Sequence, residues 1–110
     1  MRVLITGHLG FIGSVMTPII ADAGHDVTGL DSDLYKNCVY FDAPTKVPCI
    51  QKDIRDVEPG DLTGFDAVIH LAALSNDSLG NLDPEITYDI NYYGTMHLAR
   101  TAKLAGVKLF

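Results

Sequence analysis

Apolar residues gather in short unbroken runs along this chain, separated by segments rich in polar residues, glycine and proline. The clearest run lies within residues 66–74, where His70 is the main polar interruption. Such runs are typical of strands buried on both faces of a parallel sheet. We therefore predict strands over residues 3–5, 26–31, 47–54 and 66–74, and the beginning of a fifth over 107–110.

A helical pattern follows the first of these runs. Between residues 11 and 23, apolar side chains recur at helical spacing, for example at Phe11, Val15 and Ile19. Gly24 stands where a helix C-terminus commonly needs a glycine. Pro18 lies inside this helix and removes one backbone hydrogen bond, so we expect a kink there.

The longest helical pattern covers residues 83–106. Asp83 suits the N-cap, Pro84 suits the first helical position, and the carboxylate of Glu85 favours the positive end of the helix. Gly106 is expected just past the helix C-terminus. The remaining segments contain too many helix breakers for a long helix and are predicted as loops or short turns, over residues 32–46, 55–65 and 75–83.

Strands that alternate with helices define the fold class. The order predicts an α/β fold, a Rossmann-like doubly wound parallel sheet, present as an incomplete portion of about five strands. The 110 residues suffice for one small domain and show no internal boundary, so we assign 1–110 to a single domain. Because the last strand has only begun at residue 110, we expect a fragment of a longer enzyme or a very compact relative of one.

Charge and composition argue against several classes of function. Fourteen acidic residues against eight basic ones give a net charge of −6, and no run of Lys or Arg occurs, which argues against a nucleic-acid surface. The apolar runs are too short to span a bilayer, and only Met1 and Arg2 precede the first one, so we expect neither membrane insertion nor a signal peptide. Cys38 and Cys49 match no metal or redox motif; one disulfide is possible on count, but reduced thiols in a cytoplasmic protein are preferred.

Three glycines at a spacing of three residues follow the first strand. Each weakens regular structure by roughly 0.5–1 kcal/mol, so their presence needs a reason. Gly7 would allow the tight turn off the strand, Gly10 would let backbone approach a pyrophosphate, and Gly13 would let helix and strand pack closely. Free amides at the helix start, with the positive end of its dipole, would bind the phosphates. The pattern indicates a dinucleotide site.

Asp31 stands 18 residues after Gly13, at the end of the second predicted strand. An acid there holds the adenosine ribose hydroxyls and would repel the 2′-phosphate of NADP, so it favours NAD. The alternative interpretation is that the glycines form an ordinary loop and Asp31 a turn. The succession of strand, glycines, helix, strand and acid favours the cofactor site.

Four segments carry a family resemblance. TGHLGFIG (6–13) resembles the TGxxGxxG fingerprint of the extended short-chain dehydrogenase/reductase superfamily, which includes NAD-dependent epimerases and dehydratases of nucleotide sugars. KDIRD (52–56) resembles that family's segment after the third strand, and VIHLAAL (68–74) resembles its fourth strand. YDINYYGTMHLARTAKLAGV (88–107) resembles its following helix. The resemblance covers the whole chain in the right order.

The resemblance implies roles around an NAD cofactor. Backbone amides of Phe11 and Ile12 would face the pyrophosphate beside the three glycines, and Asp31 would hold the adenosine ribose. Asp53 and Ile54 would contact the adenine, the carboxylate taking its exocyclic amine. The other half of the cofactor would be lined by Leu71, Ala72 and Ala73, with Ser75 near the nicotinamide ribose and Asn91 as a brace of the active site.

The family's chemistry depends on a Tyr-x-x-x-Lys pair, which this chain lacks. The residues four positions after its five tyrosines are Val39, Pro44, Tyr92, Met96 and His97. The resemblance therefore implies the cofactor-binding, N-terminal part of an NAD-dependent nucleotide-sugar epimerase or dehydratase, with the catalytic pair and substrate region outside the chain. The chain alone is expected to be inactive. Alternatives are a carbonyl reductase of the same branch and a non-catalytic dinucleotide-binding module.

The histidines, the polar segment at 75–78 and the aromatic residues of the long helix have simpler interpretations. The four histidines share no ligand spacing, so no metal site is predicted, and His70 is interpreted as a strand residue with satisfied hydrogen bonds. Residues 75–78 could touch a substrate or form an ordinary turn. Tyr92, Tyr93 and Met96 are interpreted as packing residues, and the resemblance implies a homodimer through the helix at 84–105.

Overall fold

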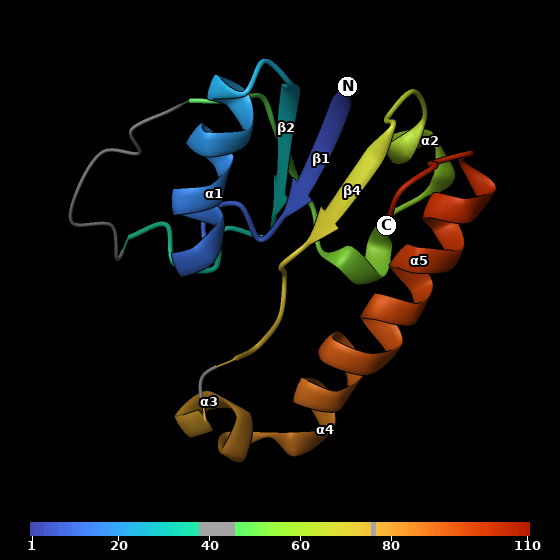
Figure 1. Cartoon of the computed structure of the whole chain (residues 1–110). Helices are drawn as coiled ribbons and strands as arrows, with labels where there is room; N and C mark the ends of the chain where they lie inside the picture. Colours follow the sequence, from blue (N-terminus) through green and yellow to red (C-terminus); the bar gives the residue numbers. More distant parts are fainter. Residues whose placement is uncertain (38–45, 76) are drawn as a thin grey trace.

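A computed structural model describes residues 1–37, 46–75 and 77–110 (Figure 1). Its centre is a four-stranded parallel sheet in the order β3-β2-β1-β4. The strands are β1 (Arg2–Thr6), β2 (Asp26–Asp31), β3 (Cys49–Gln51) and β4 (Ala67–His70). The predicted α/β class and doubly wound parallel sheet are confirmed. The beginning of a fifth strand is reduced to one parallel bridge, between Ala67 and Leu109.

Helices cover both faces of this sheet because its strands are apolar on both sides. On one face, α1 (Phe11–Asp22) packs over Val3, Ile5 and Val27 through Ile20 and Ala21. The helix has the expected extent, and Gly24 follows it with φ +86°. Pro18 lies inside α1; its kink remains a prediction.

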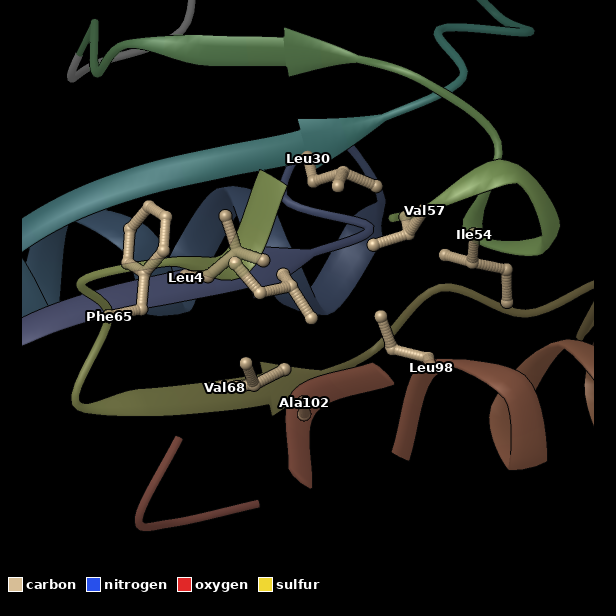
Figure 2. Close-up of a cluster of buried hydrophobic side chains, with 9 residues drawn as sticks. Leu4, Leu30, Ile54, Val57, Phe65, Val68, Leu98 and Ala102 are labelled. Atoms are coloured by element: carbon tan, nitrogen blue, oxygen red, sulfur yellow. The ribbon is translucent and has the colours of Figure 1, made fainter. Parts of the chain in front are cut away.

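The larger core lies on the opposite face (Figure 2). Leu4, Leu30 and Val68 project from β1, β2 and β4 towards α5 (Thr95–Leu104), whose Leu98 and Ala102 are buried. A 3-10 turn, η1 (Ile54–Asp56), and a short helix, α2 (Pro59–Leu62), close this core at the side. The breakers in 55–65 thus limit regular structure there, as predicted.

The predicted helix over 83–106 has the expected ends but a different interior. The Asp83 carboxylate accepts a hydrogen bond from the Ile86 N–H at 3.1 Å, and Gly106 has φ +80°. Between them lie α4 (Pro84–Tyr88), a π-helical segment η2 (Asp89–Gly94) and α5. The hydroxyl of Thr95 donates to the carbonyl of Asn91 at 2.7 Å, a bond of the kind that distorts helices.

Two other boundaries differ from expectation. β3 ends at Gln51, because the chain turns there into η1 with Asp53 as its N-cap. β4 ends at His70; the N–H of Leu71 still donates to the Thr6 carbonyl at 3.1 Å, and residues 71–75 continue outside the strand. The predicted loop over 75–83 includes a helix, α3 (Asp77–Leu82). Within the described residues, no helix is both long and apolar enough to cross a membrane.

Candidate dinucleotide-binding site

The glycine-rich turn leaves the end of β1 between β2 and β4. Gly7 has φ +70°, and its N–H donates to the carbonyl of Leu30 at 2.8 Å. A Cβ at Gly7 would lie 2.7 Å from the backbone nitrogen of Ala72. Both the left-handed conformation and the close approach therefore require glycine here. The turn is therefore hydrogen-bonded to β2 on one side and lies against the segment that follows β4 on the other.

Gly13 and Gly10 have different roles in the start of α1. A Cβ at Gly13 would lie 2.2 Å from the carbonyl oxygen of Gly7 and 2.6 Å from Cα of His8, so the helix packs directly on the turn. Gly10 is exposed, and its Cβ would meet only the same carbonyl, at 3.2 Å. Gly13 thus serves close packing, and Gly10 keeps an open surface in front of the helix.

The N-terminus of α1 fits an anionic group. Gly10 provides no side-chain cap, and the first turn contains no acidic residue. The first N–H groups of a helix have no acceptor within it, and they point along the positive end of the dipole. The amides of Phe11 and Ile12 are therefore suited to phosphate oxygens. Phe11 is 91% exposed, so its side chain does not pack over these two amides.

Asp31 joins β2 to the glycine turn. Its Oδ2 accepts a hydrogen bond from the Leu9 N–H at 3.1 Å, and its Oδ1 accepts one from the Asp33 N–H at 2.9 Å. Asp33 has φ +56°, an uncommon conformation for a residue other than glycine. Each carboxylate oxygen keeps one lone-pair direction, so Asp31 can still accept hydrogen bonds from a ribose diol.

His8 lies behind Asp31, and sequence reasoning gave it no role. Its side chain is 7% exposed, and a Cβ at Gly29 would lie 2.3 Å from two carbon atoms of its ring. Nδ1 is buried without a hydrogen-bond partner among the described residues and lies 4.0 Å from Oδ2 of Asp31. Burial lowers the pKa of His8, although the charges of Asp31 and Asp33 act in the opposite direction. The available signal was Gly29, since a glycine inside a strand often marks a close approach.

Asp53 follows β3, on the far side of β2 from β1. Arg55 donates to both of its carboxylate oxygens, from Nε at 3.0 Å and Nη2 at 2.8 Å, and also donates to Asp89 at 2.7 Å. These hydrogen bonds from Arg55 lower the pKa of Asp53. Ile54 is buried in the core, so only its backbone faces a potential ligand. Any adenine contact of Ile54 would therefore involve its backbone, and the adenine contacts of both residues stay predictions.

The segment after β4 lies on the opposite side of the turn. The N–H groups of Leu71 and Ala72 donate to the hydroxyl of Thr6 at 3.2 and 3.3 Å, and Ala73 is exposed. Asn91 accepts from the Leu74 N–H at 2.8 Å and donates to the Leu74 carbonyl at 2.9 Å. An open groove of about 390 Å³ runs beside this contact, lined by residues that include Leu74, Ser75, Thr87, Tyr88 and Asn91.

The histidines show no metal site in the described part of the chain, where no group of three or more His, Cys, Asp or Glu side chains could hold an ion. His70 is hydrogen-bonded at both ring nitrogens, which confirms its interpretation as a satisfied strand residue. Cys49 is an exposed free thiol, while Cys38 lies outside the described residues. Asn76, within the 75–78 segment, also lies outside them.

The parallel sheet and the glycine turn that follows β1 define an α/β domain of the Rossmann type. The family model described as "NAD dependent epimerase/dehydratase family" matches residues 3–110. This chain belongs to that family.

Relatives and solved structures agree with this assignment. The chain is 36% identical to a UDP-glucose 4-epimerase from Mycolicibacterium smegmatis, over 98% of this chain and 36% of the relative. It superposes with a TM-score of 0.84, at 30% identity, on a UDP-glucose-4-epimerase from Stenotrophomonas maltophila with bound NAD and formylated UDP-arabinopyranose, covering 97% of this chain and 34% of that one. For a dTDP-glucose 4,6-dehydratase from Streptomyces venezuelae with bound NAD, the TM-score is 0.81 at 31% identity, covering 99% and 38%. The chain thus spans about a third of these proteins.

Proposed function

We propose that this chain is the NAD-binding, N-terminal part of a nucleotide-sugar epimerase or dehydratase. The observation that carries the proposal is the uncapped start of α1 behind the glycine turn, with the Asp31 carboxylate anchored to that same turn at 3.1 Å. An anion site at the start of α1 and a diol acceptor at the end of β2, joined by this hydrogen bond, match the pyrophosphate and ribose of a dinucleotide. The NAD-bound neighbours support it.

The residues of this chain would bind and orient the cofactor. The amides of Phe11 and Ile12 would donate to the pyrophosphate, Asp31 would accept from the adenosine ribose, and Asp53 would accept from the adenine amine. Segment 71–75 would line the other half, with Ser75 near the nicotinamide ribose and Asn91 bracing the segment. When bound, NAD would accept a hydride from a carbon of the sugar and later return it to the sugar.

The preference for NAD over NADP follows from charge. Asp31 and Asp33 place two carboxylates at the end of β2, where a 2′-phosphate would have to enter. Like charges at short range disfavour binding, so the site would select a ribose that carries a free 2′-hydroxyl.

Catalysis and substrate binding would require residues beyond these 110. No tyrosine of the chain is followed by a lysine four residues later, and the chain spans about a third of its relatives. Residues 1–110 are therefore proposed as the cofactor domain of a larger enzyme. We further propose that this enzyme is cytoplasmic, that its substrates are nucleotide sugars, and that it binds neither nucleic acid nor membrane.

A homodimer through the helix at 84–105 is also proposed. Three tyrosine rings gather on this helix at its surface, with centroids 5.0 Å apart for Tyr88 and Tyr92 and 5.2 Å for Tyr92 and Tyr93. The sequence pattern favours packing roles for Tyr92 and Tyr93, but the two residues are 48% and 59% exposed within this chain. Aromatic residues are enriched at protein interfaces, which supports a partner on this side.

Product analysis tests the proposed function. The full-length gene product, incubated with NAD and UDP-glucose or dTDP-glucose, should yield an epimerised or dehydrated nucleotide sugar, whereas the isolated 110-residue chain should yield none. Consumption of a carbonyl compound with net oxidation of NADPH would instead support the reductase. Dinucleotide binding without any turnover would support the binding module.

A further inference from the structure

Three side chains connect the end of β1 to the π-helical segment η2. The hydroxyl of Thr6 lies 2.7 Å from Nδ1 of His70, and Nε2 of His70 lies 2.9 Å from the hydroxyl of Thr95. That hydroxyl lies 2.7 Å from the carbonyl oxygen of Asn91. The chain of hydrogen bonds therefore crosses from the sheet to the long helix without a gap.

The donors and acceptors in this chain can be assigned. The carbonyl of Asn91 can only accept, so the hydroxyl of Thr95 donates to it and must accept from the Nε2–H of His70. The neutral imidazole then has no proton on Nδ1, which accepts from the hydroxyl of Thr6. The N–H of Ala72 donates to that hydroxyl at 3.3 Å, and the N–H of Leu71 is shared between it, at 3.2 Å, and the carbonyl of Thr6, at 3.1 Å.

The surroundings of His70 favour this neutral form. The ring of His70 is hydrogen-bonded to the hydroxyls of Thr6 and Thr95 and lies near the ring of Phe110, whose centroid is 6.0 Å away. Burial alone lowers the pKa of His70. A second proton would be placed on Nδ1, where the Thr6 hydroxyl already donates, and it would break the hydrogen bond between Thr6 and His70.

The row of hydrogen bonds ends at Asn91, which also contacts the segment beside the groove. Asn91 lies within η2, and Thr95 holds its carbonyl. The side chain of Asn91 pairs with both backbone groups of Leu74, at 2.8 and 2.9 Å. Segment 71–75 is thus held at Leu71 and Ala72 by Thr6 and at Leu74 by Asn91.

We propose that His70 and Thr95 are positioning residues that fix segment 71–75, through Thr6 and Asn91, for the nicotinamide half of the cofactor. This inference rests on the proposed NAD-binding function. It predicts a selective effect, because Asp31 and Asp53 lie at β2 and β3, across β1 from the segment, and none of the described hydrogen bonds of His70 or Thr95 reaches them.

Thr95→Val is the direct test, since valine keeps the shape and removes the hydroxyl. In the full-length gene product, calorimetric titration should show NAD binding weakened about tenfold, with ADP binding unchanged. Thr95→Ser, which restores the hydroxyl, should bind NAD within about twofold of wild type. Thr63→Val is the matched control, because Thr63, the C-cap of α2, makes the same kind of bond, to the Pro59 carbonyl at 3.0 Å, away from the site.

The outcomes separate the two proposals. Equal weakening of NAD and ADP, or wild-type NAD binding by Thr95→Val, would overturn the positioning role while the proposed function stands. A wild-type protein that binds neither ligand would overturn both. If Thr95→Val does not fold, nitrogen NMR of the wild-type His70 ring decides: a neutral ring protonated at Nε2 agrees with the inference, and one protonated at Nδ1 overturns it.

Discussion

At the residue scale, the least expected feature is the pairing of His8 with Gly29. The imidazole occupies the space that any side chain at position 29 would need, with ring carbons 2.3 Å from the position of a Cβ. The sequence places His8 in the glycine turn and Gly29 within a strand, but neither shows that the two meet. Their contact depends on the pairing of β1 with β2, which brings Gly29 alongside Ile5.

Gly29→Ala should therefore destabilise the protein. Overpacking of a well-filled site typically costs about 1–3 kcal/mol, and the free energy of unfolding from urea denaturation would measure it. The double variant His8→Ala/Gly29→Ala should recover part of the loss, because the ring is gone. Gly60→Ala is the control, since nothing lies within 4 Å of its Cβ position. If the loss in the double variant equals the sum of the losses in His8→Ala and Gly29→Ala, the two residues do not interact.

Titration of His8 makes a second prediction at this scale. Burial outweighs the charges of Asp31 and Asp33, so the pKa in the folded protein lies below the usual 6.5. The unfolded chain then binds the proton first as the pH falls, and the contribution of neutral His8 to stability is full above about pH 6.5 and is lost as the pH falls through the folded pKa. NMR titration of the His8 ring checks this. A midpoint above 6.5 would mean that Asp31 dominates.

At the scale of the elements, local signals predicted α1 and β2 almost to the residue. Both ends of α1 carry glycines with local roles, Gly10 before it and Gly24 after it, and β2 ends at Asp31 as expected. The π-helical segment η2 was not predicted, because Asn91 and Thr95 follow an ordinary helical pattern. The hydroxyl of Thr95, which bonds to the Asn91 carbonyl, also bonds to His70, 25 residues away, and no local pattern shows that contact. The helix α3 was also missed, since its polar residues and glycine are typical of loops.

The packing of α1 on the glycine turn gives a prediction of its own. Gly13→Ala would put a methyl group 2.2 Å from the backbone oxygen of Gly7, so backbone must move and the helix start must shift away from the turn. NAD affinity should fall by at least about tenfold, because phosphate binding depends on that start. Calorimetric titration measures it, with Ser14→Ala in the same helix as control. Unchanged affinity would place the phosphates elsewhere.

At the scale of the whole molecule, the strand order divides the candidate site into two halves. Asp31 and Asp53 lie on the β2 and β3 side of the glycine turn, and segment 71–75 lies on the β4 side. The fold class and the position of this division follow from the sequence, because strand–helix alternation and the glycine spacing are local patterns. The restraint of segment 71–75 by Thr6 and Asn91 does not, since it joins residues from three distant parts of the chain.

The proposed function requires that this fold hold NAD through Asp31 and the start of α1. The most direct measurement is calorimetric titration of the full-length gene product, wild type and Asp31→Asn, with NAD and NADP. Wild type should bind NAD more tightly than NADP, and Asp31→Asn should weaken NAD binding about 10- to 100-fold, as expected for loss of hydrogen bonds to a charged group. If the wild type binds NADP as tightly as NAD, or if Asp31→Asn leaves the NAD affinity unchanged, Asp31 does not hold the adenosine ribose.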